Sequence, residues 1–307
     1  MKEFIRNFYI KMRYPQSSSW LHLFKGKVEH FSDLTRCNFD ENEIVVAHGW
    51  WAKREMKRLD GNIIKVHCIH GVINEELAKE AWSENVPKIA VASYLEKEVK
   101  NICGQKLTAI IPNGIDTKEY FPSVPENQRD GIGTIFGMGY HKDPKTVLGV
   151  LNQLQKRRPE VPIRVFGACR RPKEISSNIY HRLPTLEKAR ELYSRSLVWF
   201  LGSRSEGFSI PILEAMSCGC AVVATDCGGP KDIIEDGENG FLVEPGNIIQ
   251  IIKRIETLLD NPELRRRFVL KSKETVEKFS WAKSIEKMEK VLKTIADGKQ
   301  ISQAKTI

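Results

Sequence analysis

Residues 197–225 constrain the fold of this chain more than any other stretch. Two short apolar runs, LVWFL at 197–201 and AVVAT at 221–225, have the length and composition of strands buried on both faces of a parallel sheet. The stretch between them begins as a polar loop. Pro211 suits a first helical turn, and Gly219 suits the position just after a helix. The segment therefore predicts a strand, a loop, a short helix and a second strand.

This loop and helix carry two carboxylates, Glu206 and Glu214, eight positions apart. In a parallel α/β sheet, ligands bind where loops leave the carboxyl ends of the strands, and a helix N-terminus there attracts phosphate. A carboxylate at such a place can accept hydrogen bonds from the hydroxyl groups of a sugar. The spacing alone fits equally well an ordinary strand–helix unit with two surface glutamates.

The rest of the chain repeats this alternation in two halves. Predicted strands lie at 43–49, 63–69, 88–93 and 107–111, then at 134–139, 163–167, 197–201, 221–225 and 240–243. Predicted helices lie at 50–59, 74–83 and 94–102, then at 144–157, 185–195, 231–236, 247–259, 262–277 and 281–296. Such alternation is typical of α/β domains with parallel sheets. A polar, Pro-containing segment at 121–130 separates the halves, so we predict Rossmann-like domains at 1–122 and 131–280.

The net charge and the cysteine content limit the binding partners and the cellular compartment that we expect for this protein. The formal net charge of +9 calls for an anionic partner, which can be nucleic acid, a nucleotide substrate or a membrane surface. The basic clusters accompany no nucleic-acid-binding motif, so nucleic acid is not expected. Seven cysteines are an odd number, and Cys218 and Cys220 lack partners at the spacing of a metal site. With no signal sequence and no run of 18 apolar residues, these features predict a cytoplasmic protein.

Two basic stretches near the N-terminus suggest contact with a membrane. Residues 1–14 alternate apolar and basic side chains, and as a helix they would present an apolar face. The predicted helix at 50–59 carries the aromatic and basic residues Trp50, Trp51, Lys53, Arg54, Lys57 and Arg58. We therefore expect peripheral contact with an anionic membrane at its inner face, although a terminal helix packed on the first domain fits residues 1–14 at least as well.

The loop motif resembles a known family. Glu206-Gly207-Phe208 and Leu213-Glu214-Ala215-Met216 resemble the Glu-x7-Glu signature of retaining nucleotide-sugar glycosyltransferases of the group 1 type. The resemblance extends over 111–116, 218–225, Gly228-Gly229, 236–243 and 279–281. It implies the GT-B fold, in which two Rossmann-like domains face a cleft. It also implies that the C-terminal helix and tail, at 281–307, cross back to the first domain.

The resemblance implies roles for individual residues. Glu206 is expected to contact the donor sugar, Glu214 the ribose, and the backbone amides of Gly207, Phe208 and Ser209 the diphosphate. Gly139 lies in the Gly-rich turn of the second domain, where Lys142 is the better match to a lysine that neutralises the diphosphate and Lys145 the second candidate. Met138 stands where the family commonly has arginine. His70, with His48 as a second candidate, resembles a first-domain histidine near the donor sugar and the acceptor.

The implied activity is transfer of a sugar, expected to be a hexose, from a nucleotide-diphosphate sugar to a hydroxyl group of a glycan or lipid-linked acceptor, with retention of anomeric configuration. The resemblance implies no cofactor and no required metal. Residues 1–42 lack the family's apolar opening strand and Gly-Gly loop, so the first domain is expected to be shortened to about four strands. A non-catalytic subunit that partners an active transferase, and a nucleotide-sugar epimerase or hydrolase, are the alternatives.

Overall fold

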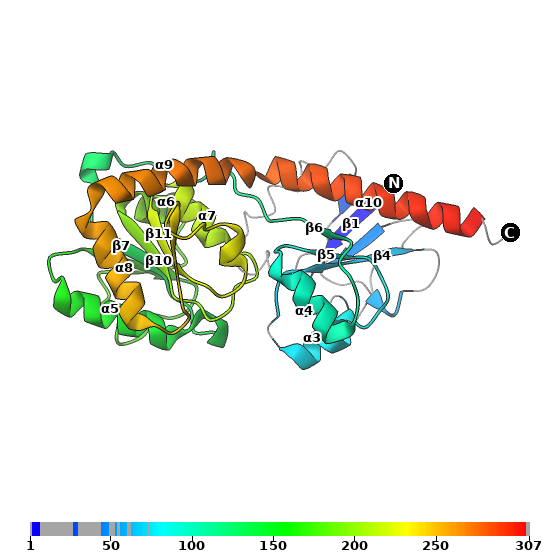
Figure 1. Cartoon of the computed structure of the whole chain (residues 1–307), viewed down its shortest axis with the longest axis horizontal. Helices are drawn as coiled ribbons and strands as arrows, with labels where there is room; N and C mark the ends of the chain where they lie inside the picture. The colour runs from blue at the N-terminus through cyan, green and yellow to red at the C-terminus, as the bar shows by residue number, and fades with distance from the viewer. Residues whose placement is uncertain are drawn as a thin grey trace. The chain divides into compact units, whose positions relative to one another are not determined.

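The chain forms two compact units. The computed structural model describes residues 2–6, 27–29, 44–48, 53, 56–59, 63–72 and 74–304. One unit comprises Met1–Gly114 and Trp281–Ile307, and the other comprises Ile115–Ser280 (Figure 1). In the described part of the chain, each unit is built on a parallel sheet of six strands, which confirms the predicted α/β class.

The second unit has the strand order β12-β11-β10-β7-β8-β9. The strands are β7 (Ile132–Ile135), β8 (Ile163–Gly167), β9 (Tyr180–Arg182), β10 (Val198–Leu201), β11 (Ala221–Thr225) and β12 (Gly240–Val243). The helices are α5 (Pro144–Arg157), α6 (Leu186–Arg195), α7 (Ile210–Ser217), α8 (Ile248–Asp260) and α9 (Pro262–Lys278), with the short 3-10 segments η3 (Glu126–Gln128), η4 (Tyr140–Lys142) and η5 (Gly229–Asp232). The predicted strand–loop–helix–strand segment is therefore present as β10, α7 and β11.

Both faces of this sheet are covered. Because side chains alternate along a strand, Val198 and Phe200 of β10 enter the core cluster that includes residues of α5 and α8. Trp199 points to the other face, where its ring lies 4.2 Å from that of Tyr193 on α6. All three strand side chains are fully buried. This two-sided burial explains why β10 reads in the sequence as a continuous apolar run.

The first unit has the strand order β2-β1-β3-β4-β5-β6. The strands are β1 (Lys2–Arg6), β2 (Lys27–Glu29), β3 (Ile44–Ala47), β4 (Ile64–Ile69), β5 (Lys88–Ala90) and β6 (Ala109–Ile110), and the helices are α3 (Glu75–Trp82), α4 (Tyr94–Cys103) and α10 (Trp281–Ala304). Helix α10 packs against β4, and Ser284 Oγ donates a hydrogen bond of 2.7 Å to the Pro112 carbonyl. The chain thus returns to its first unit at its C-terminal end.

Three predictions for the N-terminal region are wrong. The expected number of about four strands is too low, and the chain does open with a strand, β1, which pairs in parallel with β2 and β3. Its sequence, KEFIR, is too short and too charged to give a strand signal, so pairing to its neighbours decides its conformation. Lys2–Arg6 therefore do not belong to an amphipathic helix.

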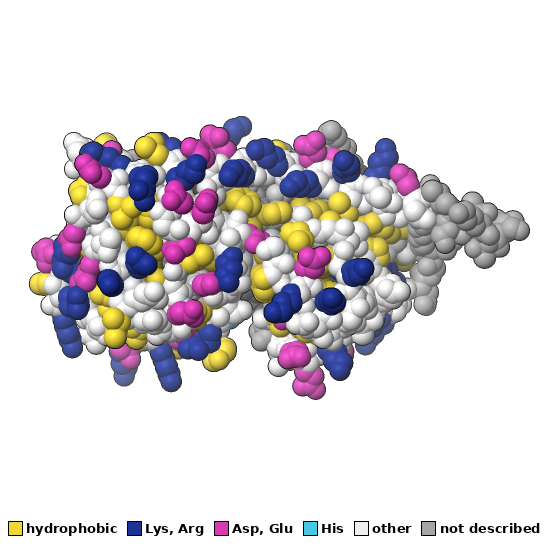
Figure 2. Space-filling model, in the orientation of Figure 1, with side chains coloured by type: hydrophobic (Ala, Val, Ile, Leu, Met, Phe, Trp, Pro, Cys, Tyr) yellow, Lys and Arg dark blue, Asp and Glu magenta, His cyan; other side chains and the backbone are white. Residues whose placement is uncertain are grey.

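The second basic stretch also differs from its prediction. Lys53 is buried, with 2% of its surface exposed, and its ammonium donates a hydrogen bond of 2.7 Å to the Cys68 carbonyl. It therefore does not present its charge to a membrane, whereas Lys57 and Arg58 are exposed. Trp50, Trp51 and Arg54 lie outside the described residues. On the face shown in Figure 2, Lys and Arg side chains are interspersed with Asp and Glu. None of the helices in the described ranges has the length and apolar character needed to cross a membrane.

In the second unit three elements differ from the sequence prediction. The helix expected at 231–236 is the short 3-10 segment η5, which holds Pro230 in its first turn. Strand β7 begins at Ile132 and ends at Ile135, so 136–139 is loop. The edge strand β9 has three residues and gives no periodic signal.

The segment at 121–130, predicted as the boundary between the domains, packs within the second unit. The Arg129 guanidinium donates hydrogen bonds to the carbonyls of Ser196 (2.8 Å) and Cys218 (3.0 Å).

We expect Gly133→Ala to lower the free energy of unfolding by about 1–3 kcal/mol, because overpacking forces neighbouring groups to move. A Cβ atom at Gly133 of β7 would lie 2.0 Å from Cζ3 of the buried Trp199 ring. Gly298→Ala is the matched control, since Gly298 is exposed on α10 and its added Cβ would meet nothing within 4 Å. Alanine there should raise stability by up to about 1 kcal/mol. Urea denaturation measures both, and equal effects would contradict the packing described here.

Candidate functional site

The loop between β10 and α7 reaches its helix through a strained residue. Ser209 precedes the helix with φ +74°, a left-handed conformation that non-glycine residues rarely adopt. Pro211 occupies the first turn, and Gly219 follows the helix with φ +82°. The loop therefore arrives at the N-terminus of α7 in one defined conformation, as functional loops often do at a cost in backbone strain.

Several hydrogen-bond donors at the N-terminus of α7 have no acceptor among the described residues. The backbone amides of Gly207, Phe208 and Ser209 donate to no other described residue. The Ser209 hydroxyl, 5% exposed as a residue, also finds no partner within the described part of the chain. Buried donors without acceptors are rare in folded proteins, and at a helix N-terminus they favour an anion.

The carboxylate of Glu206 lies at the start of the same loop. Its Oε1 atom accepts a hydrogen bond from Lys142 Nζ at 2.5 Å and another from Ser203 Oγ at 2.7 Å. The Lys142 and Glu206 side chains are only 12% and 10% exposed, so water screens this ion pair weakly. The structure thus brings together Glu206 and Lys142, which are 64 positions apart in the sequence.

Backbone contacts with the neighbouring loop fix Glu206. Its amide donates to the Cys227 carbonyl at 3.0 Å, and its carbonyl accepts from the Gly229 amide at 3.1 Å. A Cβ atom at Gly229 would lie 2.3 Å from the Gly207 carbonyl oxygen, so only glycine permits this approach. Burial raises the pKa of the adjacent Cys227 thiol to about 12, which keeps it protonated.

The turn before α5 presents Lys142 toward Glu206. Asp143 adopts φ +43° and caps α5 through Thr146, and its carboxylate also accepts from Arg204 at 2.7 Å. The predicted residues Gly139 and Lys145 are exposed at either end of this turn, and the described partners of the Glu206 carboxylate are Lys142 and Ser203 instead. Met138, where the resemblance leads one to expect arginine, is 62% exposed. Arg204 and Asp143 belong to no recognised motif, so they were not predicted from the sequence as site residues.

Glu214 is buried inside α7, with 6% of its surface exposed. Its Oε2 atom accepts a hydrogen bond of 2.7 Å from the hydroxyl of Tyr193 on α6. Phe208 is also buried, and its ring meets that of Phe279 edge to face at 5.5 Å. Phe208 thus anchors the loop by its side chain while its backbone amide stays available. Tyr193 and Ser203, which bond to Glu214 and Glu206, were also not predicted, because neither belongs to the Glu-x7-Glu motif.

His70 belongs to the first unit, where it follows β4. Its Nε2 atom lies 2.7 Å from Nδ1 of His48, so the two predicted histidines form a hydrogen-bonded pair. Burial, with a smaller contribution from the Lys53 charge, lowers the pKa of His70 to about 3. The imidazole of His70 is therefore neutral at physiological pH.

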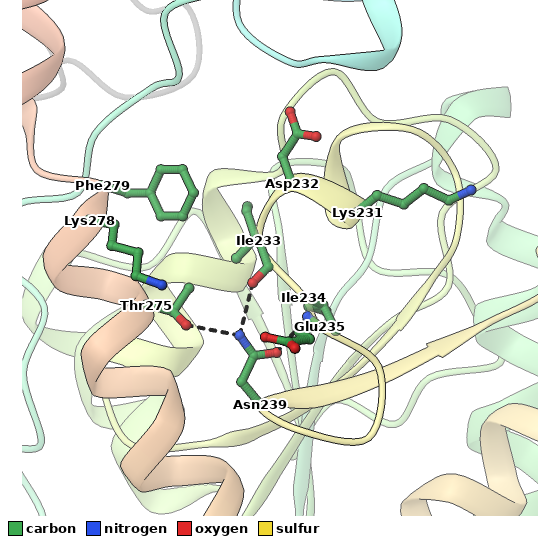
Figure 3. Close-up of a pocket in the computed structure, with 9 residues that line it drawn as sticks. All are labelled: Lys231, Asp232, Ile233, Ile234, Glu235, Asn239, Thr275, Lys278 and Phe279. Carbon is green, nitrogen blue, oxygen red and sulfur yellow. Dashed lines mark hydrogen bonds between the residues drawn. The ribbon is translucent and has the colours of Figure 1, made fainter.

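A separate hollow of about 370 Å³ lies in the second unit between η5 and α9 (Figure 3). Asn239 forms part of its wall, and its side-chain amide donates to the Ile233 carbonyl at 3.0 Å and to Thr275 Oγ1 at 2.9 Å. The polar groups of Asn239 are thus satisfied within the protein. None of the predicted site residues lines this hollow, so we do not assign the predicted ligand to it.

Comparison with known proteins identifies the family. Residues 117–275, more than half of the chain, match the family model described as "Glycosyl transferases group 1". An uncharacterized glycosyltransferase of Haemophilus influenzae is 24% identical over 279 residues, which cover 87% of this chain and 74% of that protein. The uncharacterized glycosyltransferase MJ1178 of Methanocaldococcus jannaschii is 40% identical over 95 residues, which cover 31% of this chain and 27% of that protein.

Solved structures give the fold. HepE of Anabaena, solved in complex with UDP-glucose, superposes with a TM-score of 0.77 at 15% identity, over 96% of this chain and 100% of that one. TarM superposes with a TM-score of 0.73 at 21% identity. The superposition covers 84% of this chain and 56% of TarM. The family match over more than half of the sequence, together with these likenesses in fold, shows that the chain is a GT-B member of the glycosyl transferases group 1 family.

Proposed function

We propose that this protein transfers a hexose from a nucleotide-diphosphate sugar to a hydroxyl group of a glycan or lipid-linked acceptor, with retention of anomeric configuration. The observation that carries the proposal is the set of unpaired donors at the N-terminus of α7, directly after the Glu206–Lys142 ion pair. Retention and the class of acceptor rest on the resemblance of the Glu206–Glu214 motif.

The diphosphate is the part of the donor that this arrangement suits best. The amides of Gly207, Phe208 and Ser209 donate no hydrogen bond to any described residue, and the Ser209 hydroxyl adds a fourth such donor. Breaking the bond between the sugar and the diphosphate leaves negative charge on phosphate oxygens. Donors that are already fixed in place stabilise such charge without further reorganisation. Lys142 contributes a full positive charge at the same loop.

Glu206 is suited to hold the sugar rather than to act as a base. Ser203 and Lys142 both donate hydrogen bonds to Oε1, which fixes the orientation of this carboxylate. Retention requires the acceptor oxygen to bond on the face from which the diphosphate leaves. Glu214, held by Tyr193, is our candidate for the ribose hydroxyls, and His70 of the first unit is the candidate beside the sugar and the acceptor.

We expect Glu206→Gln to lower kcat with UDP-glucose or another accepted donor by about 100-fold or more, because it removes a charge that orients the reacting sugar. Donor affinity, measured by calorimetry, should fall less than tenfold. Glu256→Gln is the matched control, since Glu256 is paired with Arg157 on the outside of α8 and should leave kcat unchanged. Donor binding without turnover in the wild-type protein would favour the non-catalytic subunit instead.

The product of the wild-type reaction tests retention and the absence of a metal requirement. Proton NMR of the first product should show an α-glycoside from an α-linked donor, and transfer should persist in excess EDTA because Lys142 and the loop amides supply the positive potential. An inverted product, or loss of activity restored by Mg²⁺, would contradict this part of the proposal. Free sugar or an epimerised donor would identify a hydrolase or an epimerase.

A stability measurement tests the ion pair without any substrate. Lys142→Met should lower the free energy of unfolding by about 3 kcal/mol, because it leaves a largely buried carboxylate unpaired. The double variant Lys142→Met/Glu206→Gln removes both charges and should recover most of that loss. Urea denaturation of the two single variants and the double variant gives the coupling energy. Additive effects would show that the two side chains do not interact.

A further inference from the structure

A second cluster of chemically active side chains lies in the first unit. Parallel pairing sets Ala47 of β3 opposite His67 of β4, so the residues that follow, His48 and Cys68, lie side by side. Residues two positions apart along an extended chain share a face, which places His70 on the same side as Cys68. His48 and Cys68 are buried, and His70 is half-buried.

The three side chains converge on one point. His48 Nδ1 and His70 Nε2 are 2.7 Å apart, and these two nitrogens and Cys68 Sγ all lie within 4.8 Å of one another. Within the described ranges, this is the one group of three or more His, Cys, Asp or Glu side chains with its ligand atoms so close together. Two imidazoles and one thiolate form a donor set that suits Zn²⁺ and its spectroscopic substitute Co²⁺.

The geometry points to a Zn²⁺-binding site formed by His48, Cys68 and His70. Zn–N bonds of about 2.0–2.1 Å in a tetrahedral site place two ligand nitrogens about 3.3 Å apart. The imidazoles must therefore separate by about 0.6 Å from their hydrogen-bonded distance, which small rotations of the two rings provide. Within the described residues the site has three protein ligands, and a water molecule or another small ligand would take the fourth position of a tetrahedral zinc.

The charge balance of the site follows from its neighbours. On coordination the Cys68 thiol proton leaves to solvent, and the proton shared by the two imidazoles moves to the other nitrogen of its own ring. One thiolate offsets half of the charge of Zn²⁺. The Lys53 ammonium, bonded to the Cys68 carbonyl, adds positive charge nearby, so we expect weaker binding than at a four-ligand structural zinc site.

This inference stands apart from the proposed function. Metal bound at this cluster would occupy Nε2 of His70, and if His70 acts beside the sugar, then Zn²⁺ is an inhibitor of transfer. It is not a requirement for transfer. The binding itself can be measured on protein that has no activity, so failure of the transferase proposal and failure of the metal proposal are separable.

The test is a Co²⁺ titration of the full chain after dialysis against a chelator. We expect one Co²⁺ per chain, with an intense thiolate-to-cobalt absorption in the near ultraviolet that Zn²⁺ displaces. Cys68→Ser should abolish this band, and His48→Asn should weaken Co²⁺ binding at least tenfold. Cys103→Ser is the matched control, because Cys103 lies in the same unit and its thiol donates to the Val99 carbonyl.

Two results would overturn the site. One is a Co²⁺ spectrum without the thiolate band, and the other is a band that survives Cys68→Ser and His48→Asn, which would mean adventitious binding at other cysteines. Circular dichroism checks that both variants fold. If either does not, X-ray absorption of the Zn²⁺-loaded wild-type chain decides, with one sulfur at about 2.3 Å and two imidazoles at about 2.0 Å expected. A first shell of oxygen and nitrogen alone would reject the site.

Discussion

Two backbone hydrogen bonds between neighbouring loops hold the part of the second unit on which the site depends. The Glu206 amide donates to the Cys227 carbonyl, and the Gly229 amide donates to the Glu206 carbonyl. These bonds extend the pairing of β10 with β11 beyond the ends of both strands. Glu206 is therefore positioned by the sheet, and its carboxylate inherits the rigidity of two fully buried strands. Rigid support of this kind is what an oriented ligand contact requires.

The sequence was most informative where packing and propensity agree. β8, β11, β12 and α5 have the predicted bounds because each is a run of apolar residues or periodic turns with Gly, Pro or Asp at its ends. β1 and β9 were not predicted, because short edge or charged strands draw their conformation from pairing rather than from local preference. No local signal identifies the residue that a strand will pair with. The number of strands in the first unit was therefore beyond sequence reasoning.

The site residues likewise fall into those that the sequence identifies and those that only the structure identifies. The motif resemblance named Glu206 and Lys142, and the structure brings their side chains into contact across 64 positions. The resemblance could not identify Ser203 or Tyr193. A single Ser or Tyr has no distinctive spacing, and the role of each depends on the residues that the fold places beside it. Lys53 shows the opposite failure. The sequence places it in a basic stretch that we expected to contact a membrane, but its aliphatic stem is buried and its ammonium donates to a backbone carbonyl.

Under the proposed function, the Glu206–Lys142 pair would allow one loop to bind two parts of the donor. Within the described residues, the Glu206 carboxylate is the anionic partner of Lys142, and Ser203 donates to the same oxygen atom. A diphosphate at the N-terminus of α7 brings more negative charge than a carboxylate, so it competes for the ammonium. If Lys142 turned toward the phosphates, Glu206 would keep its hydrogen bond from Ser203 and gain acceptor capacity for a sugar hydroxyl. In the proposed function, the pair would thus link recognition of the diphosphate to recognition of the sugar.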